Sequence, residues 1–169
     1  AAVEAYQKSR RADFSFGILK YNPQKVIGID IADSAVAFAT KIAKKKEVGN
    51  RVSFRRGDVS EMRTLPRSDI VVGLGFIDYL NADQLKHFFK LLEGKKYLFS
   101  YFEKKLSLFN IVHSLYVKIQ NCPGAFKFTK KEMRHIIPLS AKASLISKNN
   151  LIFITNIPNL KELDWQYKL

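Results

Sequence analysis

The clearest hydrophobic pattern in the chain is a short apolar run that ends in a single carboxylate. Val26 to Ile29 are apolar or small, and Asp30 follows them directly. This run predicts a buried strand. A helix is predicted next, with Asp33 or Ser34 as its N-cap. Its apolar face recurs at helical spacing and consists of Ala35, Phe38, Ala39 and Ile42.

This order of strand, acid and helix places Asp30 at the carboxyl edge of a parallel sheet. A carboxylate at that edge can accept hydrogen bonds from the hydroxyls of a ribose. The alternative is structural, because a buried strand can also end in an aspartate that only caps the next helix. The pattern by itself leaves both interpretations open.

The rest of the chain repeats this alternation of apolar strands and amphipathic helices. Thr129 and Glu132 form a capping-box pattern that begins a short helix before Pro138. Two final strands flank a Lys-Asn-Asn turn and predict an antiparallel hairpin. The fold class is therefore α/β, with a mostly parallel sheet, helices on both faces and an antiparallel last strand. The other predicted strands are residues 51–56, 70–72, 97–101, 141–147 and 151–156, and the other predicted helices are residues 13–21, 81–93 and 106–120.

Composition limits the class of protein. The 169 residues are 47% hydrophobic and 12% aromatic, which is typical of a globular chain with a sizeable core. No apolar run reaches the roughly 20 residues that span a bilayer, and no signal-peptide pattern opens the chain. Cys122 is the single cysteine, so one chain can form neither a disulfide framework nor a zinc cluster. The cytoplasm is the expected compartment.

The chain is strongly basic, with 29 Lys and Arg against 15 Asp and Glu and a net charge of +14. Such a balance is compatible with nucleic-acid binding. The basic residues are nevertheless scattered in small groups, several of them at predicted helix ends, where the helix dipole favours cations. A basic solvent-exposed surface is the preferred interpretation, and an anionic substrate, a membrane surface or RNA are the alternatives.

A further acid, Asp58 in Gly57-Asp-Val59, follows the predicted strand 51–56. Asp69 precedes the next predicted strand and opens the run Asp-Ile-Val-Val-Gly-Leu-Gly-Phe76. Together with Asp30 and the closing hairpin, these features resemble class I S-adenosylmethionine-dependent methyltransferases, which have a Rossmann-like fold. The resemblance covers Asp13 to about Pro158. It implies an N-terminal helical segment (1–12), a methyltransferase domain (13–158) and a C-terminal tail (159–169). The segment from Cys122 to Glu132 is similar to the linker and helix before the sixth strand in small-molecule members.

The resemblance implies a role for each matching position. S-adenosylmethionine is the implied cofactor and S-adenosylhomocysteine its product. Asp30 would bind the ribose, Asp58 would meet the adenine amine, and the end of the 70–74 strand would lie near the methyl donor. The implied cofactor-binding residues are Asp30, Ile31, Asp58, Val59, Gly73, Leu74 and Gly75. The substrate-side candidates are Tyr79, Tyr101, His113 and Tyr116.

One part of the family pattern is missing from the sequence. The first strand and its glycine-rich loop should precede Asp13, yet Arg10-Arg11-Ala12 runs directly into Asp13-Phe14-Ser15-Phe16. That loop lets the backbone approach the methionine part of the cofactor. We expect a segment carrying this strand to be absent from the printed sequence between Ala12 and Asp13. If the protein truly lacks the strand, it is instead a non-catalytic relative.

The predicted activity is methyl transfer to a small-molecule acceptor, lipid- or quinone-like, because apolar and aromatic side chains flank the implied acceptor side. His113 is the candidate general base, although a structural histidine is the commoner case. Asp78 is expected to cap the next helix, and a role as a polar residue of the acceptor pocket is the alternative. The alternatives are an RNA methyltransferase, a non-catalytic binding protein on the same fold and, more weakly, a dinucleotide-dependent oxidoreductase. No Asp-Pro-Pro-Tyr or Pro-Cys motif is present at the matching positions, which argues against methylation of DNA amines or of cytosine carbon. No metal site is predicted, and the oligomeric state is not predicted.

Overall fold

The computed structural model describes residues 14–104, 126–148, 151–158 and 160. The chain divides into two compact units, Ala1–Met62 and Arg63–Leu169. Several predictions lie outside the described residues: the helical segment 1–12, the junction of Ala12 and Asp13, the helix 106–120 and most of the tail 159–169. The predicted domain bounds, 1–12, 13–158 and 159–169, therefore stay predictions.

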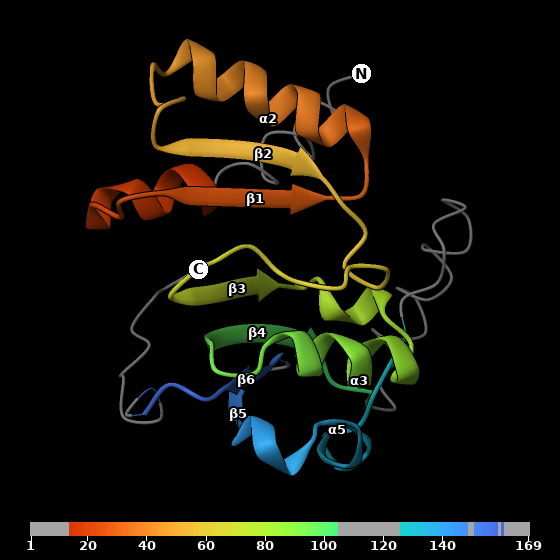
Figure 1. The fold of residues 1–169 in the computed structure, drawn as a ribbon. Helices are drawn as coiled ribbons and strands as arrows, with labels where there is room; N and C mark the ends of the chain where they lie inside the picture. The colour runs from red at the N-terminus through yellow and green to blue at the C-terminus, as the bar shows by residue number, and fades with distance from the viewer. Residues whose placement is uncertain (1–13, 105–125, 149–150, 159, 161–169) are drawn as a thin grey trace. The chain divides into compact units, whose positions relative to one another are not determined.

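The first unit is a parallel strand pair with one long helix. It contains η1 (Ile18–Tyr21), β1 (Val26–Asp30), α2 (Asp33–Lys45) and β2 (Val52–Arg56). β1 and β2 pair in parallel from Val26 opposite Val52 to Asp30 opposite Arg56. Figure 1 shows α2 running alongside this pair, and the helix buries Ala39 and Ala43. The predicted strand–acid–helix unit is confirmed.

The start of α2 differs from the prediction. Ala32 is the N-cap and has no side-chain capping bond, while Asp33 is already the first helical residue. The Oδ1 atom of Asp30 accepts a hydrogen bond from the backbone N–H of Ala32 at 2.9 Å. This bond tightens the turn, so that only Ile31 and Ala32 separate the strand from the helix. The prediction that Asp33 or Ser34 caps the helix is therefore wrong, and the side chain of the strand-end acid holds the turn.

The second unit contains a four-stranded sheet in the order β3-β4-β6-β5. Its strands are β3 (Ile70–Leu74), β4 (Lys96–Phe102), β5 (Ser144–Lys148) and β6 (Leu151–Thr155). β3 and β4 are parallel, and β6 runs antiparallel to both of its neighbours, β4 and β5. The predicted parallel pairing, closing hairpin and antiparallel last strand are confirmed.

The core of this unit is an aromatic cluster between α3 (Ala82–Leu91) and β4. Phe88 and Phe89 come from the helix, and Tyr97 and Phe99 from the strand, and all of them are buried. Their rings meet mostly edge to face, with centroids 5.3 Å apart for Phe88 and Phe99 and 5.9 Å apart for Phe89 and Tyr97. Burying one such side chain stabilises the fold by about 1.5–3 kcal/mol.

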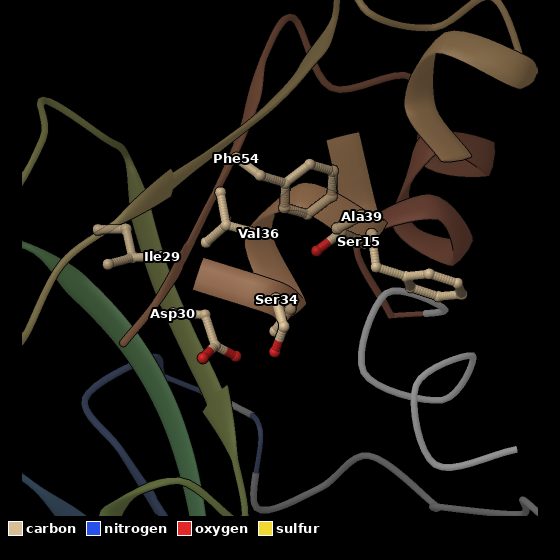
Figure 2. Close-up of a pocket in the computed structure, with 10 residues that line it drawn as sticks. Ser15, Ile29, Asp30, Ser34, Val36, Ala39 and Phe54 are labelled. Atoms are coloured by element: carbon tan, nitrogen blue, oxygen red, sulfur yellow. The ribbon is translucent and has the colours of Figure 1, made fainter. Parts of the chain in front are cut away.

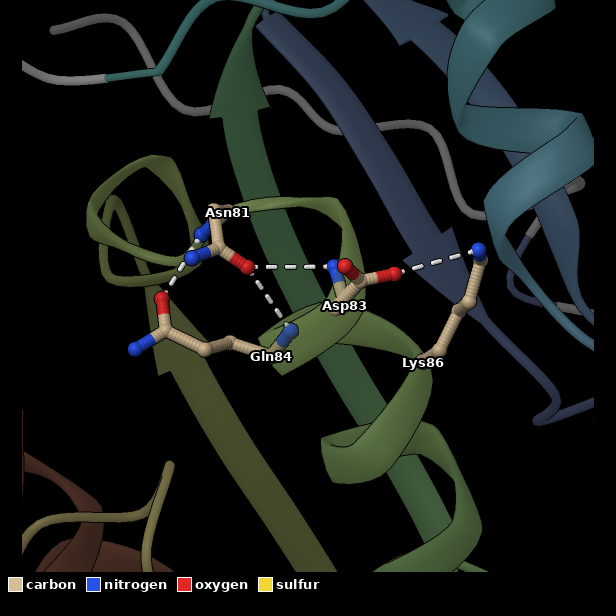
Figure 3. Close-up of polar contacts among 4 residues, drawn as sticks. All are labelled: Asn81, Asp83, Gln84 and Lys86. Carbon is tan, nitrogen blue, oxygen red and sulfur yellow. Dashed lines mark hydrogen bonds and ion pairs between the residues drawn. The ribbon is translucent and has the colours of Figure 1, made fainter.

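Capping side chains set the starts of the two α-helices that the structure describes in the second unit. Asn81 accepts hydrogen bonds from the backbone N–H groups of Asp83 and Gln84, and the Gln84 side chain accepts one from Asn81 (Figure 3). Asp78 lies upstream in the short turn η2 (Ile77–Tyr79), so the prediction that it caps α3 is wrong. The predicted capping box of Thr129 is confirmed at α5 (Lys130–Ile136), which leads into η3 (Leu139–Ala141). None of the helices described here has the length and apolar character needed to cross a membrane.

Candidate functional site

A pocket in the first unit lies beside the carboxyl end of β1. Figure 2 shows the carboxylate of Asp30 and the hydroxyl of Ser34 extending into the same region, with the Phe54 ring and Val36 further along the pocket. Asp30 comes from the last position of β1 and Ser34 from the first turn of α2. The pocket is lined by Ser15, Gly28, Ile29, Asp30, Ser34, Ala35, Val36, Phe38, Ala39 and Phe54.

The shape of this pocket depends on a glycine in the middle of β1. Gly28 is the direct register partner of Phe54 on β2. A Cβ atom at Gly28 would overlap the Phe54 ring, so glycine at this position leaves room for the ring. Ser34 and Phe54 were not predicted as site residues. The glycine inside an apolar strand was the available signal, because such a glycine often marks a close approach of another group.

The carboxyl ends of β1 and β2 are tied together. The backbone N–H of Gly57 donates to the carbonyl oxygen of Asp30 at 3.0 Å, and Asp58 follows directly. One carboxylate oxygen of Asp58, Oδ1, accepts from both the backbone N–H and the hydroxyl of Ser60, at 2.9 and 2.7 Å. Asp30 and Asp58 therefore stand at the ends of two adjacent parallel strands, as the sequence predicted.

The two other cofactor candidates of this unit flank these acids. Ile31 has an exposed side chain, and its carbonyl oxygen accepts a hydrogen bond from Nε of Arg56 at 3.4 Å. The same nitrogen lies 3.6 Å from a carboxylate oxygen of Asp33, and both side chains of this ion pair are exposed. Val59 is half-buried in the turn that begins at Asp58.

The hydrogen-bonding groups of this pocket fit a ribose. A carboxylate offers about four lone-pair sites, and the bond to Ala32 uses one of those on Asp30. The remaining sites can accept hydrogen bonds from two neighbouring hydroxyls, while Ser34 adds a group that both donates and accepts. The apolar wall formed by Val36 and Phe54 suits a flat organic ring.

The second unit carries the predicted glycine positions at the end of β3. Gly73 pairs with Phe99, and an added Cβ would lie 2.8 Å from the Phe76 ring and 3.0 Å from the Phe99 ring. Gly75 has a φ of 65° and open space where a side chain would project. Its N–H donates to the carbonyl and the hydroxyl of Ser100, both at 3.1 Å. Leu74, between the glycines, is exposed.

The substrate-side candidates of this unit differ in exposure. Tyr79 is exposed, whereas Tyr101 is fully buried, and its hydroxyl has no hydrogen-bond partner in the part of the chain that the structure describes. Burial raises the pKa of Tyr101, and the nearby carboxylates of Glu103 and Asp78 raise it further. His113 and Tyr116 lie outside the described residues, so their predicted roles stay predictions.

Asp78 is a buried acid whose environment the sequence did not predict. Its side chain is 8% exposed, and burial raises its pKa from 3.8 to about 6, against the opposing effect of a hydrogen bond from the backbone N–H of Phe102. Within the described ranges, no three His, Cys, Asp or Glu side chains gather as metal ligands. The described residues of this unit offer hydrogen bonding, aromatic contact and, at Asp78, an acid with a raised pKa.

Comparison with known proteins supports the resemblance to methyltransferases that the sequence showed. A search of curated proteins gives no match. Among solved structures, magnesium protoporphyrin IX methyltransferase from Synechocystis PCC 6803, with bound SAH, superposes with a TM-score of 0.62 at 16% identity, over 87% of this chain and 70% of that one. PigF with SAH gives a TM-score of 0.68 at 16% identity, over 86% of this chain and 47% of that one.

An O-methyltransferase family 2 protein from Planctomyces limnophilus, in complex with apigenin, gives a TM-score of 0.62 at 16% identity, over 85% of this chain and 46% of that one. The chain thus spans about half the length of these last two proteins. At such low identity the likeness shows the fold, which is the predicted Rossmann-like fold of methyltransferases.

The family itself follows from a match to the sequence. The model of a methyltransferase domain matches residues 11–139, which include β1 to β4 and α5. Membership in this family implies S-adenosylmethionine as the cofactor, in agreement with the prediction from the strand-end acids. The chain belongs to the methyltransferase domain family, as its resemblance to class I S-adenosylmethionine-dependent methyltransferases predicted.

Proposed function

We propose that this protein transfers a methyl group from S-adenosylmethionine to a small-molecule acceptor. The observation that carries the proposal is the placement of Asp30: its carboxylate ends β1, lines a pocket and has lone pairs beyond the one bound to Ala32. Membership in the methyltransferase domain family supplies the reaction class.

Asp30 is the proposed ligand of the ribose hydroxyls, with Ile31 beside it. Asp58 and Val59 are the proposed neighbours of the adenine. The bonds from Ser60 orient the Asp58 carboxylate before any ligand arrives, because they fix one of its oxygens. This preorganisation lowers the conformational cost of binding.

Gly73, Leu74 and Gly75 are the proposed contacts near the reacting end of the cofactor. Gly75 fits this role because its left-handed backbone and the open space beside it allow a ligand to approach the main chain closely. The bifurcated hydrogen bond from its N–H to the carbonyl and the hydroxyl of Ser100 holds that backbone in place. When bound, the cofactor supplies an electrophilic methyl group on a sulfonium, whose departure leaves a neutral sulfide.

The protein's contribution to such a displacement is positioning. The acceptor atom must lie in line with the methyl group, and water must be excluded. We propose a lipid- or quinone-like acceptor, with Tyr79 and Tyr101 on the substrate side and His113 as the candidate base for a hydroxyl acceptor. The relative solved with apigenin is one with a flat aromatic ligand.

The test is calorimetric titration with S-adenosylhomocysteine of the wild type, Asp30→Ala and Asp33→Ala. Asp33 is a matched control, because it is an acid of the same turn whose side chain is 77% exposed and paired with Arg56. Hydrogen bonds to a charged group contribute about 1.5–3 kcal/mol each, so Asp30→Ala should weaken binding at least about tenfold. Asp33→Ala should leave the affinity within about a factor of two of the wild type.

The outcomes separate the proposal from its rivals. Equal weakening by both variants would reject the ribose role of Asp30. A folded protein that does not bind S-adenosylhomocysteine would reject the methyltransferase. Binding without methyl transfer to any acceptor would favour the non-catalytic binding protein, and retention on RNA that falls steeply with salt would favour the RNA methyltransferase.

A further inference from the structure

Three exposed aromatic side chains stand near the carboxyl ends of β3 and β4. Tyr79 follows β3 and is 60% exposed, Phe102 ends β4 and is 55% exposed, and Phe126 precedes α5 and is 44% exposed. We call these residues the aromatic rim. Single exposed aromatic residues need no explanation, but a group of them at the ligand-binding edge of a parallel pair does.

Asp78 connects the three rim residues through the main chain. Its carboxylate accepts a hydrogen bond from the backbone N–H of Phe102. Its carbonyl oxygen accepts one from the backbone N–H of Phe126 at 2.6 Å. Tyr79 is the next residue along the chain. One buried residue thus holds together three segments that are far apart in sequence, so the rim is a built feature of the second unit.

Further contacts brace the segment that carries Phe126. The Phe126 ring stacks on Phe128, with centroids 6.5 Å apart and planes inclined by 24°. The carbonyl oxygen of Phe128 accepts a hydrogen bond from the backbone N–H of Lys104, just beyond β4, at 3.0 Å. Phe126 is nevertheless 44% exposed, so part of its side chain is accessible to a ligand. A ring held in this way loses little conformational entropy when it binds one.

From this arrangement we propose that the acceptor carries a planar aromatic ring system, which stacks on the aromatic rim. The inference rests on the proposed function and narrows its acceptor class. Aromatic side chains gain offset-stacked or edge-to-face contacts from a second ring, beyond the area that they bury. A lipid chain has no such preference. Asp78 is a positioning residue in this site, because it acts through the backbones of the rim residues.

The experiment measures binding of two probes to the full chain by ligand-observed NMR, with S-adenosylhomocysteine at saturation. The probes are 2-naphthol and 1-decanol, which have the same number of carbon atoms and one hydroxyl each. They differ in whether the carbon skeleton is a flat ring system or a flexible chain. A single-stranded RNA oligonucleotide is the third probe, because unpaired bases also stack on exposed aromatic residues.

Phe102→Ala and Phe126→Ala test the rim, and Tyr21→Ala is the matched control. Tyr21 is an aromatic residue of the first unit with 68% exposure and no place in the proposed site. Stacking of a ring on an aromatic side chain contributes about 1–3 kcal/mol, so each rim variant should weaken 2-naphthol binding at least about fivefold. Tyr21→Ala should leave it unchanged.

Preferential binding of 2-naphthol, weakened by both rim variants and not by the control, supports the proposal. Equal or tighter binding of 1-decanol, binding of 2-naphthol that the rim variants do not alter, or no binding of either probe overturns it. Rim-dependent binding of RNA in preference to 2-naphthol overturns it in favour of an RNA acceptor. The S-adenosylhomocysteine titration reports separately on the proposed function, so the two failures are distinguishable.

Discussion

Tyr97 and Tyr101 form a natural pair for testing the hydrogen bonding of this fold. Both are on β4, and their side chains are 1% and 0% exposed. The Tyr97 hydroxyl donates to the carbonyl oxygen of Ala141 at 2.8 Å, whereas that of Tyr101 has no partner among the residues described. Burial raises the pKa of Tyr97 to about 12 and also raises that of Tyr101, so both hydroxyls stay protonated at neutral pH.

The two phenylalanine variants should change stability in opposite directions. A buried polar group without a partner costs about 1–3 kcal/mol, so Tyr101→Phe should raise the free energy of unfolding by about 1 kcal/mol. Tyr97→Phe removes a made bond and leaves the Ala141 carbonyl without it, which should lower that free energy by about 1 kcal/mol. At about 2–4 °C per kcal/mol for a chain of this size, the two melting temperatures should differ by about 4–8 °C.

Urea unfolding of the ligand-free protein measures both free energies. Far-ultraviolet and near-ultraviolet circular dichroism should give coincident transitions, and the m-values should match the wild type, because neither variant alters the surface exposed on unfolding. Loss of about 1 kcal/mol or more in Tyr101→Phe, as in Tyr97→Phe, would refute the reasoning. It would mean that the Tyr101 hydroxyl has a hydrogen-bond partner in the folded protein in solution.

Two further predictions concern the glycine of β1 and the buried acid after β3. Gly28→Ala should lower the free energy of unfolding by about 1–3 kcal/mol, because its Cβ would overlap the Phe54 ring. Urea unfolding measures this loss. The same substitution in a Phe54→Ala protein should lower the free energy of unfolding by less, because the overlapping ring is absent. In the wild type, the raised pKa of Asp78 contributes stability that is complete below about pH 4 and lost as the pH rises through about 6. Asp78→Asn keeps an acceptor for the Phe102 N–H but does not titrate. The variant should therefore have a higher free energy of unfolding than the wild type at pH 8, by on the order of 2–3 kcal/mol, and the same one at pH 4. An equal effect at both pH values would contradict it.

Most of the elements and their order could be predicted from local patterns in the sequence. Apolar runs such as Val26–Asp30 and capping pairs such as Thr129 and Glu132 are local signals, and each corresponds to an element of the structure. The hairpin was predictable for the same reason, since a short polar turn between two apolar runs favours antiparallel pairing of those runs. The position of Asp30 at a strand end followed from that pattern alone.

The surroundings of these positions depend on contacts between segments that lie far apart in the sequence. The Phe54 ring over Gly28 depends on the register of β1 and β2, and the bond from Phe126 to Asp78 joins residues far apart in sequence. The start of α2 was mispredicted because the Asp30 side chain holds the preceding turn. Hydrophobic periodicity specifies which face of an element is buried, whereas the partner of each buried group is set by strand pairing and packing between distant segments. That is why the acids and Tyr79 were found from the sequence, whereas Phe126 and its hydrogen bond to Asp78 were not.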